Sequence, residues 1–94
     1  MDSQEPFIRP INKTINPTEQ LAIFDEIAEE RKRQDAEWDE QNHHPHKWTD
    51  ILMEEVGEVS KALLEGSLLT CRDELIQVAA VCVAMIESLD RGSK

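Results

Sequence analysis

Carboxylate side chains are clustered at two places in the sequence, and each cluster has the spacing of one helical turn. The first is the segment EEVGE, which contains Glu54, Glu55 and Glu58. The second is Glu74, followed three residues later by Gln77. Hard cations such as Mg²⁺ take oxygen ligands and keep water molecules for the phosphates of a substrate. If the two segments lie on antiparallel helices, four oxygen-bearing side chains converge, so the spacing indicates a metal site.

The EEVGE carboxylates lie at different positions around a predicted helix. Successive helical residues turn by about 100° around the axis. On that wheel Glu55 falls at the edge of an apolar stripe, Glu58 falls next to it, and Glu54 lies further toward solvent. The stripe consists of Leu52, Val56, Val59 and Leu63. We therefore expect Glu55 and Glu58 to point into one groove between helices, and Gly57 to let another backbone or a ligand approach closely.

Glu74 stands at the head of an apolar helix face. That face continues through Val78, Val81 and Met85. An isolated buried charge is very costly, so a carboxylate in this position needs an ionic partner or a metal ion. Gln77, one turn later, needs hydrogen-bond partners of its own. The alternative to a metal site is a solvated acidic surface with salt bridges from Lys61 and Arg72, because charge runs are usually exposed.

Three histidines, His43, His44 and His46, lie in the segment NHHPHK, which Pro45 marks as a loop. Zinc sites usually space histidines by three to five residues or combine them with cysteine. Two interpretations are open for this segment. Its histidines are either incidental residues of a solvated loop or side chains that line the mouth of a pocket.

Three helices are predicted to position these residues. The first spans about 17–39, with Asn16 as its N-cap and Pro17 in its first turn. The second begins at Pro45 or Trp48, runs to about Glu65 and ends at Gly66. The third spans about 71–91, with Thr70 as its N-cap, Asp73 completing a capping box and Gly92 at its end. No segment has convincing strand alternation, so the fold class is all-α.

One helical domain at 17–94 is predicted to follow an extended or partly disordered arm at 1–16. In the third helix, the segment LIQVAAVCVAMI at 75–86 is apolar except for Gln77. A helix that is apolar on all sides is buried on all sides. Three helices cannot cover it, so we expect antiparallel helices in a bundle that is completed by a homo-oligomer.

The formal net charge of −10 excludes the nonspecific nucleic-acid binders, which need a basic surface. It would also repel a free nucleoside triphosphate unless a divalent cation stands between them. The first residues lack a basic segment followed by an apolar run, so no signal peptide is expected, and no apolar stretch reaches membrane-spanning length. Cys71 and Cys82 fit neither a disulfide framework nor a zinc motif, which favours a soluble, cytoplasmic protein. An acidic module that mimics nucleic acid is a further interpretation, although it does not require the regular spacing of the carboxylates.

The segments EEVGEVSKALLEG and RDELIQVAAV resemble the MazG-like nucleotide pyrophosphohydrolases, an all-α superfamily that includes dimeric dUTPases. The hallmark of these proteins is ExxE, a spacer and then ExxD. Glu55 and Glu58 match the first half, and Glu74 begins the second, in which Gln77 replaces the final aspartate. The resemblance covers about residues 20–91 and is greatest to the short, phage-type members.

The resemblance implies a helical bundle of two or four chains that holds Mg²⁺, or Mn²⁺ in its place. Its implied metal ligands are Glu55, Glu58, Glu74 and Gln77. The implied reaction is hydrolysis of a nucleoside triphosphate at the α-phosphorus, which gives the monophosphate and pyrophosphate. Glu54 would then lie behind the ligands or orient the attacking water, and Glu55 and Glu58 are the other expected catalytic residues.

The remaining substrate contacts expected from the resemblance are phosphate and base contacts. Lys61, one turn after Glu58, and Arg72 are the phosphate candidates. Trp38, Trp48 and His43 are the base candidates, since a base can stack on an aromatic ring. For the tryptophans the alternative is that they join the ends of the first two helices. Because Gln77 supplies one negative charge fewer than aspartate, a protein that has lost turnover and binds a nucleotide or a protein partner is the alternative function.

Overall fold

The computed structural model describes residues 16–92, which form three helices. Their bounds are Pro17–Trp38 for α1, Pro45–Leu64 for α2 and Leu68–Asp90 for α3. No strand occurs in this part of the chain, which confirms the all-α prediction. None of the described helices is long and apolar enough to cross a membrane. The predicted arm, apart from Asn16, lies outside the described residues.

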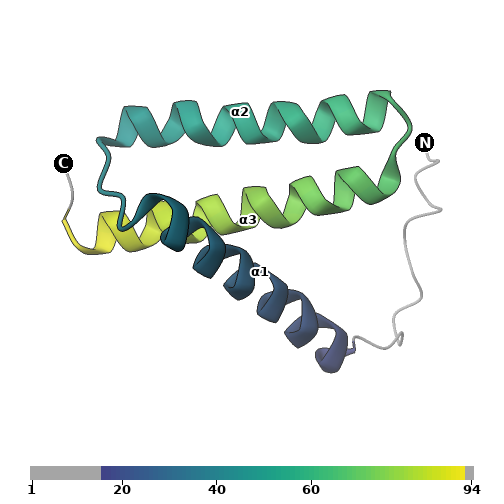
Figure 1. Cartoon of the computed structure of the whole chain (residues 1–94), viewed down its shortest axis with the longest axis horizontal. Coiled ribbons are helices and arrows are strands. Elements are labelled where there is room, and N and C mark those ends of the chain that lie inside the picture. The colour runs from purple at the N-terminus through teal and green to yellow at the C-terminus, as the bar shows by residue number, and fades with distance from the viewer. Residues whose placement is uncertain (1–15, 93–94) are drawn as a thin grey trace, which may run out of the picture.

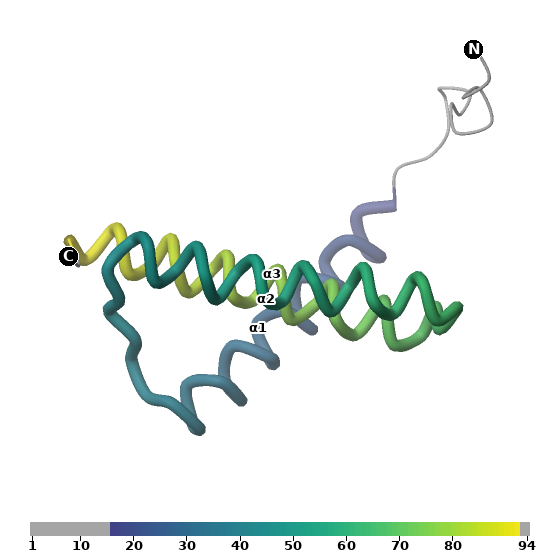
Figure 2. Tube along the Cα trace, turned by 90° about the horizontal axis from the view of Figure 1, so that it is seen from above, coloured from purple at the N-terminus to yellow at the C-terminus, as the bar shows by residue number. Residues whose placement is uncertain are grey.

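The central helix of the fold is α3, which packs against both of the others. Figures 1 and 2 show α2 and α3 side by side and antiparallel, joined by a tight turn. The helix α1 crosses α3 near its own middle, where Glu26 contacts Arg72 of α3 and Arg31 contacts Glu87, and both ends of α1 lie away from the pair in Figure 2. Among the described residues α1 makes no contact with α2, so a gap remains between these two helices.

The helix ends follow local sequence signals. Asn16 caps α1 as predicted, because its side chain accepts hydrogen bonds from the backbone N–H groups of Thr18 and Glu19. The prediction that Thr70 caps α3 is wrong. Ser67 is the N-cap, and its hydroxyl accepts a hydrogen bond of 3.3 Å from the Thr70 N–H. Gly66 has a φ of 76°, which lets the chain leave α2 and reach that cap within three residues.

The hydrophobic core is small and lies between α2 and α3. It consists of Trp48, Val81 and Ala84, with Ile51, Leu52 and Met85 packed against them. Trp48 is the largest fully buried side chain, at 1% exposure. The end of the α2–α3 pair that carries Trp48 is therefore its best-packed region, whereas Leu64, Leu68 and Leu69 at the opposite, turn end are exposed.

The apolar stripe predicted for α2 is only partly buried. Val56 is 37% exposed and Leu63 is 53% exposed, while Trp48 and Ala62 are buried instead. The reason is that α3 covers α2 on one side only, and that side includes the half-buried Glu55. The predicted position of Glu55 at the edge of the core is confirmed.

The helix α3 also has an uncovered apolar face in the single chain. It consists of Leu75, Ala79, Cys82, Ile86 and Leu89, which recur every three or four residues. Leu75 is 51% exposed and Ile86 is 57% exposed. Leu75 lies about 160° around the helix from Gln77, at about 100° per residue. We call this set the uncovered face, and it accounts for the apolar sequence that α1 and α2 leave unburied.

Candidate functional site

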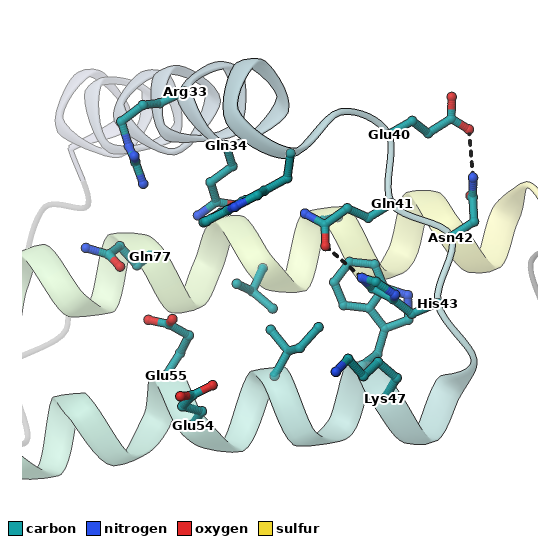
Figure 3. Close-up of a pocket in the computed structure, with 15 residues that line it drawn as sticks. Arg33, Gln34, Glu40, Gln41, Asn42, His43, Lys47, Glu54, Glu55 and Gln77 are labelled. Atoms are coloured by element: carbon teal, nitrogen blue, oxygen red, sulfur yellow. Dashed lines mark hydrogen bonds between the residues drawn. The ribbon is translucent and has the colours of Figure 1, made fainter.

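A pocket of about 630 Å³ occupies the gap between α1 and α2, with α3 as its floor. Figure 3 shows side chains from all three helices and from the loop at 39–44 around this space. Its two ends differ in chemistry. One end carries carboxylates and an amide from α2 and α3, and the other carries a histidine, which contacts the buried indole of Trp48, and the polar side chains of the loop.

The acidic end of the pocket brings together two predicted site residues from different helices. Figure 3 shows Glu55 of α2 pointing toward Gln77 of α3, with Glu54 beside Glu55. All three line the pocket. Glu54 is exposed, as predicted, yet it faces this space. Glu58 is exposed and Glu74 is half-buried, and in the single chain neither lines the pocket.

Glu55 is the side chain whose ionisation is most affected by this arrangement. Burial raises the pKa of Glu55, and the negative charges of Glu74, Glu54 and Glu58 raise it further. Glu30 of α1 adds a smaller contribution in the same direction. Carboxylates from all three helices thus act on one side chain, and they disfavour its charged form.

The donor atoms of the four predicted ligands have the chemistry that Mg²⁺ requires. Glu55, Glu58 and Glu74 offer carboxylate oxygens, and Gln77 offers a neutral amide oxygen. The raised pKa of Glu55 reflects burial and the negative electrostatic potential of the neighbouring carboxylates. A bound cation would lower that pKa by stabilising the charged form of Glu55. Within residues 16–92, however, no three His, Cys, Asp or Glu side chains lie close enough together to hold a metal ion. The residue types fit the metal, but the predicted ligands do not converge in the single chain.

The two tryptophans that line the pocket differ in the surface that they leave free. Trp48 is 1% exposed and belongs to the core, whereas Trp38 is 53% exposed and also lines the pocket. His43 contacts the edge of Trp48, with ring centroids 4.9 Å apart and an interplanar angle of 70°. Of the predicted base contacts, Trp38 therefore has the largest surface available for stacking, and Trp48 is mainly a core residue that supports His43.

The histidines have local structural roles in the loop. His44 is the N-cap of α2, and its Nδ1 accepts a hydrogen bond of 3.1 Å from the His46 N–H. The rings of His44 and His46 also meet edge to face. Only His43 lines the pocket. The interpretation of the histidines as residues of a pocket mouth thus applies to one of the three.

The predicted phosphate contacts, Lys61 and Arg72, do not line the pocket. The guanidinium of Arg72 donates two hydrogen bonds, of 2.8 and 2.7 Å, to the carboxylate of Glu26 on α1. This pair lowers the pKa of Glu26 and raises that of Arg72. Arg72 therefore ties the start of α3 to α1, and Lys61 is exposed on α2.

Sequence reasoning missed the cations that do line the pocket, Arg33 of α1 and Lys47 of α2. Figure 3 places Arg33 above Gln77, at the acidic end, and Lys47 beside His43 at the other end. Arg33 bonds to Glu30 and Glu37, which raise its pKa. No sequence signal pointed to Arg33 on the face of α1 that lines the pocket, because it lies five positions before Trp38, about 140° around the helix at about 100° per residue.

Gln34, one turn before Trp38, is the buried polar residue of this face. It is 5% exposed and lines the pocket. Its Oε1 accepts a hydrogen bond of 3.0 Å from Arg31, and its Nε2 donates one of 2.9 Å to Glu30. Buried amides need such partners. The network fixes the α1 wall of the pocket.

The reason proposed for Gly57 receives no support from the single chain. A Cβ atom built at Gly57 would have no atom within 4 Å, so no neighbouring backbone or side chain of the described residues requires a glycine there. Gly57 lies in the middle of α2, where glycine costs about 1 kcal/mol relative to alanine. Its presence is unexplained by the packing of one chain.

Comparison of the chain with family models, with curated proteins and with solved structures finds no match. The resemblance to the MazG-like proteins therefore stays a prediction from the two motifs. A proposal of function for this chain rests on those motifs and on the geometry of the pocket.

We predict that Glu55→Gln stabilises the metal-free protein at neutral pH. The folded state raises the pKa of Glu55, so its ionised carboxylate opposes folding. This penalty is present above the folded-state pKa and disappears as the pH falls below the unfolded value of about 4.3. Thermal melts in a chelator should show a higher midpoint for the variant at pH 7 and a shrinking difference toward pH 4.

The matched control for this comparison is Asp50→Asn, which removes one negative charge from an exposed position of the same helix. It should change the melting midpoint less than Glu55→Gln does. Equal stabilisation by both variants would mean that net charge alone is responsible. A loss of stability in Glu55→Gln would contradict the electrostatic description of the site.

Proposed function

We propose that this chain is an Mg²⁺-dependent nucleoside triphosphate pyrophosphohydrolase with a MazG-like fold. The observation that carries the proposal is that Glu55 and Gln77 face each other at one end of a pocket whose other end carries His43 and the edge of Trp48. A nucleotide has the same polarity, with phosphates at one end and a flat base at the other. The ExxE segment supplies the first of these residues and the ExxQ segment supplies the second.

In this proposal the residues of the acidic end act on the triphosphate. Glu55 and Gln77, together with Glu58 and Glu74 one helical turn away from them, would hold Mg²⁺, which would neutralise phosphate charge and lower the pKa of a bound water. Arg33 lies on the same side and would exchange its contacts with Glu30 and Glu37 for phosphate oxygens, which together with Mg²⁺ would lessen the repulsion that a net charge of −10 imposes on the substrate. Glu54, beside Glu55, orients the attacking water.

The aromatic end holds the nucleoside. The exposed ring of Trp38 offers a stacking surface, and stacking on one aromatic ring contributes roughly 1–3 kcal/mol per base. His43 and the loop side chains also line the pocket and offer hydrogen-bonding groups. A cytoplasmic location belongs to the proposal, since nucleotides are abundant there and Cys71 and Cys82 are free thiols.

A second copy of the chain completes the fold in this proposal. The uncovered face of α3 is apolar along its length. Neither α1 nor α2 of the same chain packs over it. Contiguous exposed apolar surface marks association. Packing of this face against a partner would produce the homodimer or homotetramer of a MazG-like bundle and would bury Leu75 and Ile86.

We predict pyrophosphate release from at least one member of a panel of NTPs and dNTPs in the presence of Mg²⁺, or of Mn²⁺ in its place. Glu58→Gln should lower kcat about 100-fold, because loss of a carboxylate ligand weakens the stabilisation of phosphate charge. Glu65→Gln, at the exposed end of the same helix, is the matched control and should keep wild-type activity. Hydrolysis by Glu58→Gln at the wild-type rate would contradict the metal site.

The variant Gln77→Asp distinguishes the pyrophosphohydrolase from the alternative function, which is a protein that binds nucleotides without turnover. Restoring the charge that the ExxQ segment lacks should tighten Mg²⁺ binding and increase the rate of a working hydrolase. If the wild type binds nucleotides without releasing pyrophosphate and Gln77→Asp creates release, the chain is a binding protein that has lost turnover. If neither protein binds a nucleotide, the proposed function is wrong.

We also predict that Ile86→Lys converts the oligomer to a monomer. A lysine in the centre of a buried apolar interface loses its hydration without gaining a partner. Ala36→Lys, an equivalent charge at an exposed site on α1, is the control and should leave the oligomer intact. Sedimentation of the two variants and the wild type distinguishes these results, and a wild-type monomer would contradict this part of the proposal.

A further inference from the structure

The loop at 39–44 between α1 and α2 forms one wall of the pocket. Four consecutive residues, Glu40, Gln41, Asn42 and His43, line it. The loop begins at Asp39, whose φ of 60° and ψ of −167° are uncommon for a residue with a side chain. Such a conformation costs on the order of 1–3 kcal/mol and persists when surrounding contacts hold it. Contacts from outside the loop are therefore expected to hold Asp39 and the residues that follow it.

Arg91, at the far end of the described chain, supplies those contacts. It is the C-cap of α3, and its guanidinium reaches three successive residues of the loop. Its Nε lies 2.8 Å from the Glu40 carboxylate and donates to the Asn42 Oδ1 at 2.9 Å. One Nη donates to the Gln41 carbonyl at 3.1 Å. Asn42 in turn donates to Glu40 at 3.2 Å, which closes a small network.

The network continues from the loop into the aromatic end of the pocket. The Gln41 side chain forms a hydrogen bond of 2.7 Å with the His43 ring, as Figure 3 shows. The His43 ring contacts the edge of the buried Trp48. Arg91 fixes the backbone carbonyl of Gln41, and the side chain of the same residue fixes His43. A continuous set of contacts therefore links the end of α3 to the nucleoside side of the pocket.

We propose that Arg91 is a positioning residue that latches the 39–44 loop against α3 and thereby sets the affinity of the pocket for the nucleoside part of its ligand. The inference rests on the proposed function, which it deepens. Arg91 does not line the pocket itself, so it acts through Gln41 and His43. The phosphate part of the ligand lies against α2 and α3 at the other end and does not depend on the latch.

The shape of the arginine side chain is essential to this role. One exposed ion pair contributes little to stability, so the charge attraction to Glu40 alone would not order the loop. The planar guanidinium instead directs Nε and Nη to two different acceptors at once. A lysine at this position keeps one positive charge near Glu40 but cannot bond to Asn42 and the Gln41 carbonyl in the same geometry.

The latch is tested with Arg91→Ala and Arg91→Lys in the full chain. Lys32→Ala, which removes an exposed ion pair to Glu29 on α1, is the matched control. Hydrogen exchange of the amides at 40–43 reports loop order without any ligand. Two ligands are then titrated in Mg²⁺: a non-hydrolysable nucleotide with a methylene group between the α- and β-phosphates, and inorganic tripolyphosphate.

We expect Arg91→Ala to accelerate exchange in the loop and to raise the Kd of the nucleotide by about tenfold, equivalent to about 1.4 kcal/mol. The Kd of tripolyphosphate should stay unchanged, and Arg91→Lys should restore neither property. Unchanged loop exchange in Arg91→Ala would overturn the latch. Equal weakening of both ligands would also overturn it, because it would indicate a general structural loss. If the wild type binds neither ligand, the proposed function fails, and exchange alone then decides whether Arg91 orders the loop.

Discussion

The half-buried carboxylate of Glu55 is the group on which the organisation of the pocket depends. It lies at the edge of the α2 core face, where burial and carboxylates from α1, α2 and α3 raise its pKa. A single chain thus places mutually repelling carboxylates where α2 and α3 meet. That repulsion opposes folding of the metal-free protein, and a divalent cation with its phosphate ligand is the kind of partner that would relieve it.

The pocket exists because α3 alone joins the other two helices. Since α1 and α2 make no contact with each other within the described residues, the space between them stays open above α3. Arg72 and Glu26 hold α1 to one part of α3, and Arg91 holds the loop to its end. These polar contacts join α1 and the loop to α3, whereas the small core around Trp48 lies between α2 and α3.

The helices and the position of Glu55 could be predicted from the sequence because they depend on local periodicity and capping. Asn16 was correctly predicted as the N-cap of α1. Ser67 was not predicted as the N-cap of α3, because Thr70 with Asp73 offered an equally good local capping pattern. Arg72 was assigned to phosphate because its partner Glu26 is 46 residues away and only the packing of α1 brings them together. Arg33, Lys47 and the Arg91 network were missed for the same reason, since periodicity along one helix does not reveal which other helix it faces.

The most direct test of the proposed metal site is to locate a bound cation. Mn²⁺ broadens nuclear magnetic resonance signals of nearby residues, and it can be titrated into the labelled protein with a non-hydrolysable nucleotide present. The account predicts broadening centred on residues 54–58 and 74–77, including the side-chain amide of Gln77. Broadening centred on the acidic groove that Asp25, Glu26 and Glu29 form with α3, or none at substoichiometric Mn²⁺, would contradict it.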